Sequence, residues 1–245
     1  MSEATEAVDD GSAGGAARRS LTEVLSTDEL SFIVEPRRED RGSVQRIAGE
    51  CEQAGASAIS LSVDAGFGID DLALARSGCT LPVIARGHVA DAGRVQALRD
   101  AGADALMAPA RSWIREATDE PQDGVEPAHD SLAGIVRAAH AAGMEVVLTV
   151  HDEDELGFAV DSDADVLNID NRDQDGRVDV ERTFDLLAQV PVGWPVISES
   201  IAALEQVAKL HRAGVDALLL DEGHLDTGLQ SALAVYADAS VDQHQ

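Results

Sequence analysis

The sequence predicts a single (β/α)8 barrel, the TIM-barrel fold, and three observations support this prediction. Eight short apolar runs alternate with eight amphipathic helical patterns. Glycines recur where a helical pattern ends, and each unit of helix and strand takes about 20–25 residues. The chain of 245 residues leaves no room for a large second domain. An open doubly wound sheet is the alternative, but no GxGxxG follows the first strand.

The strands are predicted from apolar runs that are continuous rather than alternating. Such runs are typical of parallel strands that are buried on both faces. In chain order the predicted strands are Ser31–Val34, Ala58–Val63, Leu81–Ala85, Ala105–Ala108, Glu145–Val150, Val166–Ile169, Pro195–Ser198 and Ala217–Leu220.

The helices are predicted from apolar residues that recur with helical spacing between these runs. They are Val44–Ala54, Ile69–Ser77, Ala92–Ala101, Ser131–Ala142, Glu153–Val160, Val180–Gln189, Ile201–Ala213 and Gly228–Ala237. Gly55, Gly78, Gly102, Gly143 and Gly214 follow five of them, and we expect these glycines to end the helices in a left-handed conformation.

Two segments fall outside this pattern. Residues 1–20 are small and polar, and we expect a disordered tail over residues 1–27 that precedes the barrel over residues 28–240. The second segment is the acidic, proline-containing loop Glu116–Asp130, whose relation to the barrel mouth the sequence leaves open.

The formal net charge is −28, and the sequence contains a single lysine, Lys209. Such a charge repels phosphate backbones and anionic lipid, so we expect no nucleic-acid or membrane partner. We interpret the acidic, lysine-poor composition as salt adaptation, with an acidic protein of an ordinary cytosol as the alternative.

The location of the protein is predicted from its apolar runs and its cysteines. No apolar run approaches the ~18 residues of a membrane span, and no signal-peptide pattern is present. Cys51 and Cys79 form no CxxC pair. These features favour a protein of the cytoplasm.

Polar side chains follow most of the predicted strands. In a barrel the carboxyl ends of the strands surround one mouth, so we expect these side chains to bind a small polar ligand there. The candidate catalytic residues are Glu35, Arg86 and Glu199, and the candidate binding residues are Arg37, Phe67, His88, Asp170, Arg172 and Ser200. The alternatives are that the charges face water or pair with one another and that Phe67 belongs to the core. His88, His151 and Asp170 show neither HxH nor HExxH spacing, so no metal is expected.

The order of these strand-end motifs resembles that of the indole-3-glycerol phosphate synthase family. The similar segments include MEVVLTVHDEDEL (144–156), NIDNRD (168–173) and SES (198–200). The resemblance implies a lyase of tryptophan biosynthesis that closes an indole ring with decarboxylation and dehydration, without a cofactor. It implies a small phosphorylated substrate, and either a monomer or association with other enzymes of the pathway. Glu35, Arg172, Glu199 and Ser200 match family positions.

Several positions depart from the family pattern. Arg86 and Arg37 replace two lysines, one of which is the family's general acid, and Thr149 replaces a glutamate. Asp170 replaces an asparagine. Ile201 and Asp221 stand where the family has phosphate-binding glycines.

Two hypotheses follow from these departures. In the first, Arg86 stabilises charge while Glu35 or His88 handles the proton, because arginine is a poor proton donor. In the second, the barrel is a non-catalytic or differently specific homologue that binds a small polar ligand or a partner protein.

Overall fold

Eight parallel strands close into a barrel in the order β1 to β8, with β8 pairing back onto β1. The computed structural model describes residues 19–36, 43–118, 130–173, 175–201, 203–221, 224 and 228–241, without the side chains of 115–118. The strands are β1 (Ser31–Glu35), β2 (Ala58–Ser62), β3 (Val83–Arg86), β4 (Ala105–Pro109), β5 (Glu145–Val150), β6 (Val166–Asp170), β7 (Val196–Glu199) and β8 (Ala217–Asp221). The predicted fold is confirmed.

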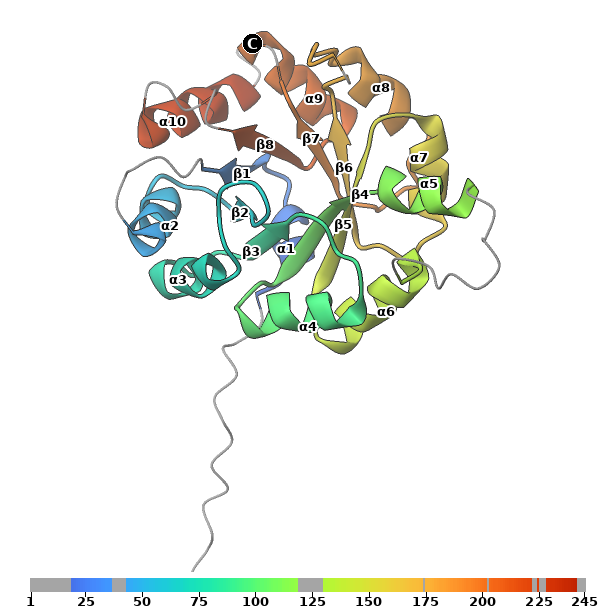
Figure 1. Ribbon diagram of the computed structural model, residues 1–245. Helices are drawn as coiled ribbons and strands as arrows, with labels where there is room; N and C mark the ends of the chain where they lie inside the picture. The colour runs from blue at the N-terminus through green and yellow to red at the C-terminus, as the bar shows by residue number, and fades with distance from the viewer. Residues whose placement is uncertain are drawn as a thin grey trace, which may run out of the picture.

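Helices surround the strands in a ring (Figure 1). They are α2 (Val44–Gln53), α3 (Asp70–Gly78), α4 (Ala92–Asp100), α5 (Arg111–Thr118), α6 (Leu132–Ala141), α7 (Glu153–Val160), α8 (Glu181–Leu187), α9 (Val207–Ala213) and α10 (Leu229–Ser240), with the 3-10 turn η1 (Leu204–Gln206) before α9. No helix among the described ranges has the length and apolarity to cross a bilayer.

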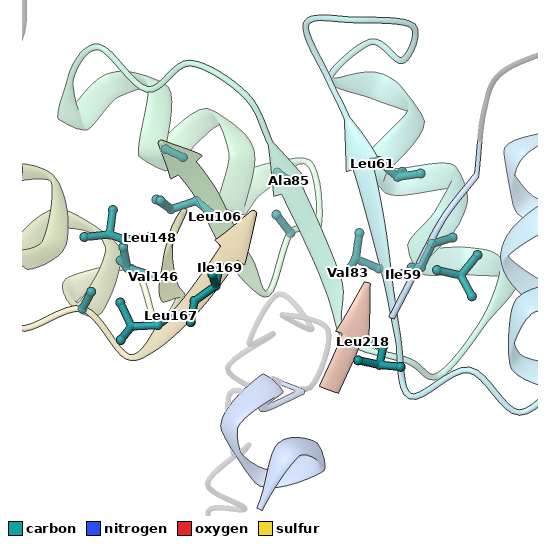
Figure 2. Packing of buried hydrophobic residues seen from close by; sticks show 14 of the residues in the cluster. Ile59, Leu61, Val83, Ala85, Leu106, Val146, Leu148, Leu167, Ile169 and Leu218 are labelled. Atoms are coloured by element: carbon teal, nitrogen blue, oxygen red, sulfur yellow. The ribbon is translucent and has the colours of Figure 1, made fainter. Parts of the chain in front are cut away.

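The strand residues alternate between two hydrophobic layers. Outward-facing side chains such as Ile59, Val83 and Leu148 pack in the layer that also contains residues of the helices (Figure 2). The side chains at the alternate positions of the strands point the other way and form a separate buried cluster, which includes Ile33, Ile84 and Ile197. Because strand side chains alternate, residues two positions after these also face the barrel interior, now at its carboxyl end.

The amino-terminal end of the barrel interior is filled by the short helix α1 (Leu21–Leu25). Leu21 and Leu25 are fully buried in the inner cluster. The buried carboxylate of Glu145 accepts hydrogen bonds from the backbone N–H of Leu21 and from the hydroxyls of Ser20 (2.9 Å) and Thr22 (2.6 Å). A negative charge at a helix N-terminus is favourable.

Helix α1 corrects the predicted boundary at residue 27. Residues 19–27 belong to the ordered fold, because two leucines among polar residues supply enough apolar surface to seal the barrel. Residues 1–18 of the expected tail lie outside the described residues, as do residues 119–129 of the acidic loop.

The glycine joints are confirmed with one exception. Gly55, Gly102 and Gly214 follow helix ends with φ values of +93°, +105° and +103°. Gly78 does not have a positive φ; it is the last residue of α3. A Cβ there would overlap the backbone carbonyl of Gln45, so the close approach of α2 and α3 requires the glycine.

Candidate active site

Three strands deliver their last residues to one ionic cluster at the mouth. Glu35 ends β1, Arg86 ends β3 and Glu199 ends β7. The Nη1 group of Arg86 donates to Glu35 Oε2 at 3.1 Å and to Glu199 Oε1 at 2.7 Å. Closure of the barrel therefore brings together the three residues predicted to be catalytic, although they lie far apart in the sequence.

Neighbouring polar groups hold both carboxylates in place. The hydroxyls of Ser60 and Ser62 donate to the two oxygens of Glu35, at 3.0 and 2.9 Å. The side-chain amide of Asn168 donates to Glu199 Oε2 at 2.7 Å and to Thr149 Oγ1 at 3.1 Å. Each carboxylate oxygen thus has a donor, which fixes the orientation of both glutamates.

Burial and ion pairing shift the pKa values of Arg86 and Glu199, with a different consequence for each residue. Burial alone would lower the pKa of Arg86, but the ion pairs with Glu199 and Glu35 outweigh burial and raise it. Burial raises the pKa of Glu199 despite its ion pair with Arg86. Arg86 therefore keeps its proton and can act only through its charge, whereas Glu199 takes up a proton more readily than an exposed glutamate.

A cavity of about 420 Å³ lies beside this cluster, over the carboxyl ends of β2 to β6. Its lining combines an apolar part with several charged side chains. The apolar part contains Ala65, Met107, Ala108 and Pro109; the polar part contains Ser62, Asp64, Arg86, His88, Arg111, Ser112, Thr149, His151 and Asp170. The composition suits a small ligand with both an apolar and a charged portion.

His151 forms a second ionic cluster in the cavity wall. Its Nδ1 lies 2.8 Å from Glu155 Oε2, and its Nε2 lies 3.4 Å from Asp170 Oδ2. Burial would lower the pKa of His151, but hydrogen bonds with Asp170 and Glu155 raise it. The two carboxylates therefore favour the protonated form of the imidazole.

Asp170 is the anionic member of the cavity wall. Burial would raise its pKa, but hydrogen bonds from His151, from the Arg172 backbone N–H at 2.9 Å and from the Ser200 hydroxyl lower it to about 2. Asp170 is adjacent to Glu199 in the register of β6 and β7, which connects the two clusters.

Of the other predicted site residues, some lie at the cavity or its rim and one is buried in the core. His88 lines the cavity but is exposed, and its backbone N–H donates to Asp64. Arg172 is half-exposed at the rim, with Nη2 3.7 Å from Asp221 Oδ2. The prediction that Phe67 faces the ligand is wrong: its ring is 5% exposed in the hydrophobic core, which was the alternative. Arg37 lies outside the described residues.

Sequence reasoning missed two of the residues at the site. Arg111, the first residue of α5, lines the cavity with its Nε 3.1 Å from Glu155 Oε1. Asn168 is fully buried and lies two residues before Asp170, on the same face of β6. Strand alternation is a signal that identifies Asn168, because it places this residue inside the barrel.

At the rim beside β7 and β8, His224 contacts Ile201 and Asp221, the two residues for which the resemblance implies phosphate-binding glycines. His224 contacts Asp221 Oδ1 through Nδ1 at 2.7 Å and the backbone carbonyl of Ile201 through Nε2 at 2.8 Å. The hydrogen bond with Asp221 raises the pKa of His224. Ile201 itself is buried. This arrangement of side chains differs from that of an open, glycine-rich phosphate site, in which backbone N–H groups are accessible.

The closed barrel and the polar cluster at its carboxyl end place the chain among TIM-barrel proteins, whose characterised enzymes have their active sites at this face. More narrowly, the chain belongs to the indole-3-glycerol phosphate synthase family, whose pattern matches residues 36–227. Indole-3-glycerol phosphate synthase 2 of Streptomyces coelicolor is 32% identical over 223 residues, which cover 83% of this chain and 79% of the relative. The synthase of Desulfotalea psychrophila is 33% identical over 221 residues, covering 84% and 77%.

Solved structures support the fold at lower identity. A 3-hexulose-6-phosphate synthase superposes with a TM-score of 0.64 at 15% identity, covering 86% of this chain and all of that chain. The N-acetylmannosamine-6-phosphate 2-epimerase from Clostridium perfringens gives 0.61 at 19% identity, covering 84% of this chain and 93% of that one. At this identity the likeness concerns the barrel alone.

Proposed function

We propose that this protein is a carboxy-lyase of the indole-3-glycerol phosphate synthase type. In this reaction the ring carbon that bears the carboxylate of an anthranilate-derived ribulose phosphate bonds to the sugar carbonyl carbon. The carbonyl oxygen takes up a proton, the carboxylate leaves as carbon dioxide, and the new hydroxyl leaves as water. The observation that carries the proposal is the Glu35–Arg86–Glu199 cluster beside a cavity of about 420 Å³.

Arg86 supplies electrostatic stabilisation in this proposal. Its guanidinium lines the cavity, and its position is fixed by two carboxylates before a substrate arrives. A fixed cation stabilises the negative charge that develops on the carbonyl oxygen during ring closure. Glu199, with its raised pKa, is the group proposed to accept the proton that leaves the methylene carbon beside the nitrogen during dehydration, when the new five-membered ring becomes aromatic.

His151 is the group proposed to donate the proton to the carbonyl oxygen. It lines the cavity, its carboxylate neighbours favour its protonated form, and its Nε2 is 3.4 Å from Asp170 Oδ2. An imidazolium proton is more readily donated than a guanidinium proton, even where neighbouring carboxylates raise the pKa of the imidazole. The proposal therefore assigns proton donation to His151 in place of His88 or Glu35.

The test is to supply the anthranilate-derived ribulose phosphate in concentrated KCl and to follow indole fluorescence. The wild-type protein is expected to turn over, and Glu35→Gln is expected to reduce turnover at least about tenfold, because it weakens the support of Arg86. Absence of turnover at substrate concentrations that saturate binding would refute the lyase assignment.

A differently specific homologue is the second candidate, and one observation favours it. Thr149 occupies the position of the family's fifth-strand glutamate and accepts a hydrogen bond from Asn168. A hydroxyl cannot act as a carboxylate base at neutral pH. This candidate predicts that the same substrate binds and is recovered unchanged.

A further inference from the structure

Asn168 lies inside the barrel, two residues before the end of β6 and one layer of side chains below the ionic cluster at the mouth. It is fully buried and is not among the residues that line the cavity. A ligand in this cavity therefore does not contact Asn168, which can affect a reaction there only through its neighbours.

The carboxamide of Asn168 links the side chains of two other strands. Its Nδ2 donates to Glu199 Oε2 at 2.7 Å and to Thr149 Oγ1 at 3.1 Å, so both amide hydrogens are used. Its Oδ1 is buried and has no hydrogen-bond partner among the residues that the structure describes. An unpaired buried acceptor is destabilising, and an apolar side chain of similar size would avoid this cost. The amide is therefore better explained by what it does to Glu199 than by packing.

Arg86 and Asn168 hold different oxygens of Glu199. Oε1 accepts from the guanidinium of Arg86 at 2.7 Å, whereas Oε2 accepts from the neutral amide of Asn168. A proton is disfavoured on the oxygen that faces the cation, because it would replace an attraction between opposite charges. Oε2 is thus the more basic oxygen, and the hydrogen bond from Asn168 sets the direction of its remaining lone pair.

The other groups that face Glu199 act on its charge in opposite directions. Asp170, its partner in the register of β6, raises the pKa of Glu199, and the ion pair with Arg86 lowers it. Glu35 shares the guanidinium of Arg86, and the register partner on β8 is the apolar Leu219. A hydrogen bond to the carboxylate favours its charged form, so loss of the Asn168 amide should raise the pKa of Glu199 further.

We infer that Asn168 is a positioning residue for the proton acceptor: its amide holds Glu199 Oε2, and the Thr149 hydroxyl holds the amide. The inference rests on the proposed function in that Glu199 is the base of that reaction. It also gives a role to Thr149, which acts here through its hydrogen bond with Asn168 rather than as a base.

Carbon-13 NMR of the full-length protein, labelled at the glutamate carboxyl carbons, tests the inference without turnover. The signal of Glu199 is identified by its loss in Glu199→Gln. Asn168→Leu keeps a side chain of similar size but no donor, and it should raise the pKa of Glu199 by about one unit. Thr149→Val should raise it less, because Glu199 keeps its own hydrogen bond, and Thr149→Ser should restore the wild-type value.

The pH dependence of turnover supplies a second readout. A base acts in its deprotonated form, so wild-type kcat should decline as the pH falls through the pKa of Glu199. Asn168→Leu should move this decline upward by about one pH unit and lower the maximal kcat about tenfold. KM should stay within about twofold of the wild-type value, since Asn168 does not line the cavity.

Thr183→Val is the matched control for the loss of a buried hydroxyl. Thr183 is fully buried on α8, and its hydroxyl bonds to Asn171 and Ser198 rather than to the side chain of Glu199. This variant should change neither the titration of Glu199 nor the acidic decline of kcat. An effect equal to that of Asn168→Leu would show that any loss of buried polar contacts has the same result and would overturn the inference.

The remaining outcomes separate this inference from the proposed function. A raised pKa of Glu199 in Asn168→Leu, without turnover by the wild-type protein, supports the positioning role and refutes the lyase. Turnover with an unchanged titration of Glu199 or an unmoved acidic decline in Asn168→Leu overturns the positioning role. Failure of Thr149→Ser to restore the wild-type value also overturns it. If Asn168→Leu does not fold, the comparison of Thr149→Val with Thr149→Ser decides by the same criteria.

Discussion

Arg86, the last residue of β3, bonds to carboxylates from two other strands. Its planar, permanently charged group suits this bridging position better than a lysine ammonium, which is a compact point charge. Arg86→Gln should leave Glu35 and Glu199 unpaired in a largely buried site and lower the free energy of unfolding by about 3 kcal/mol at neutral pH. Denaturant unfolding monitored by circular dichroism measures this difference.

The control for this prediction is Arg46→Gln, which breaks an exposed pair with Glu50 and should cost less than about 1 kcal/mol. The loss in Arg86→Gln should also shrink at acidic pH, where protonation removes the repulsion between the two glutamates. A loss no greater than that of the control would show that the ionic cluster does not support the mouth.

His151 provides a prediction for the pH dependence of turnover. As a general acid it acts in its protonated form, so wild-type kcat should fall as the pH rises through its pKa, which lies above 6.5. His151→Gln should lower kcat about a hundredfold or more and abolish this alkaline decline. A variant that retains the decline would assign the proton to another group.

Asp170 provides a prediction for stability in acid. Its folded pKa of about 2 lies below the value of 3.8 for an unperturbed aspartate, so its contribution is present above pH 3.8 and is lost as the pH falls through about 2. The contribution amounts to about 2 kcal/mol. The free energy of unfolding of Asp170→Asn should therefore change less between about pH 4 and pH 2 than that of the wild-type protein. Parallel curves for the two proteins would refute the assigned pKa.

The sequence predicted the members of the central cluster but not how they are paired. Glu35, Arg86 and Glu199 directly follow predicted strands, so their convergence followed from the barrel. Arg111 was missed because it begins a helix that the acidic loop obscured, and strand 4 offered no charged last residue. Phe67 was misplaced because periodicity does not show on which side of a loop a ring packs.

At the scale of elements, α1 closes the amino-terminal end of the barrel although the sequence did not predict it. Leu25→Ala should create a cavity inside the barrel and lower the free energy of unfolding by about 3 kcal/mol. Glu23→Ala on the exposed side of the same helix should have an effect within about 0.5 kcal/mol. Equal stabilities of the two variants would show that α1 does not seal the barrel.

The eight strands and the helices α2 to α4 and α6 to α10 were predictable because strongly patterned segments dominate a barrel sequence. The helices α1 and α5 were not, since each is short and adjoins a polar segment. Isolated helices of this length are unstable in water, so tertiary contacts that no local pattern reports decide whether they form.

For the whole molecule, the net charge of −28 predicts a dependence of stability on salt. Repulsion among the carboxylates is screened as the Debye length falls from about 10 Å at 0.1 M salt to about 3 Å at 1 M. The melting temperature should therefore rise by several degrees between these conditions, at about 2–4 °C for each kcal/mol gained. Calorimetry in KCl measures the rise, and a constant or falling melting temperature would contradict the interpretation as salt adaptation.

The most direct test of the central claim is a single-turnover experiment with the protein in excess over a substrate labelled in its carboxylate carbon. The account predicts that labelled carbon dioxide and indole product appear in equal amounts, and that Glu199→Gln, with its fold intact, forms neither at a comparable rate. Full recovery of the labelled substrate from the wild-type protein would contradict it.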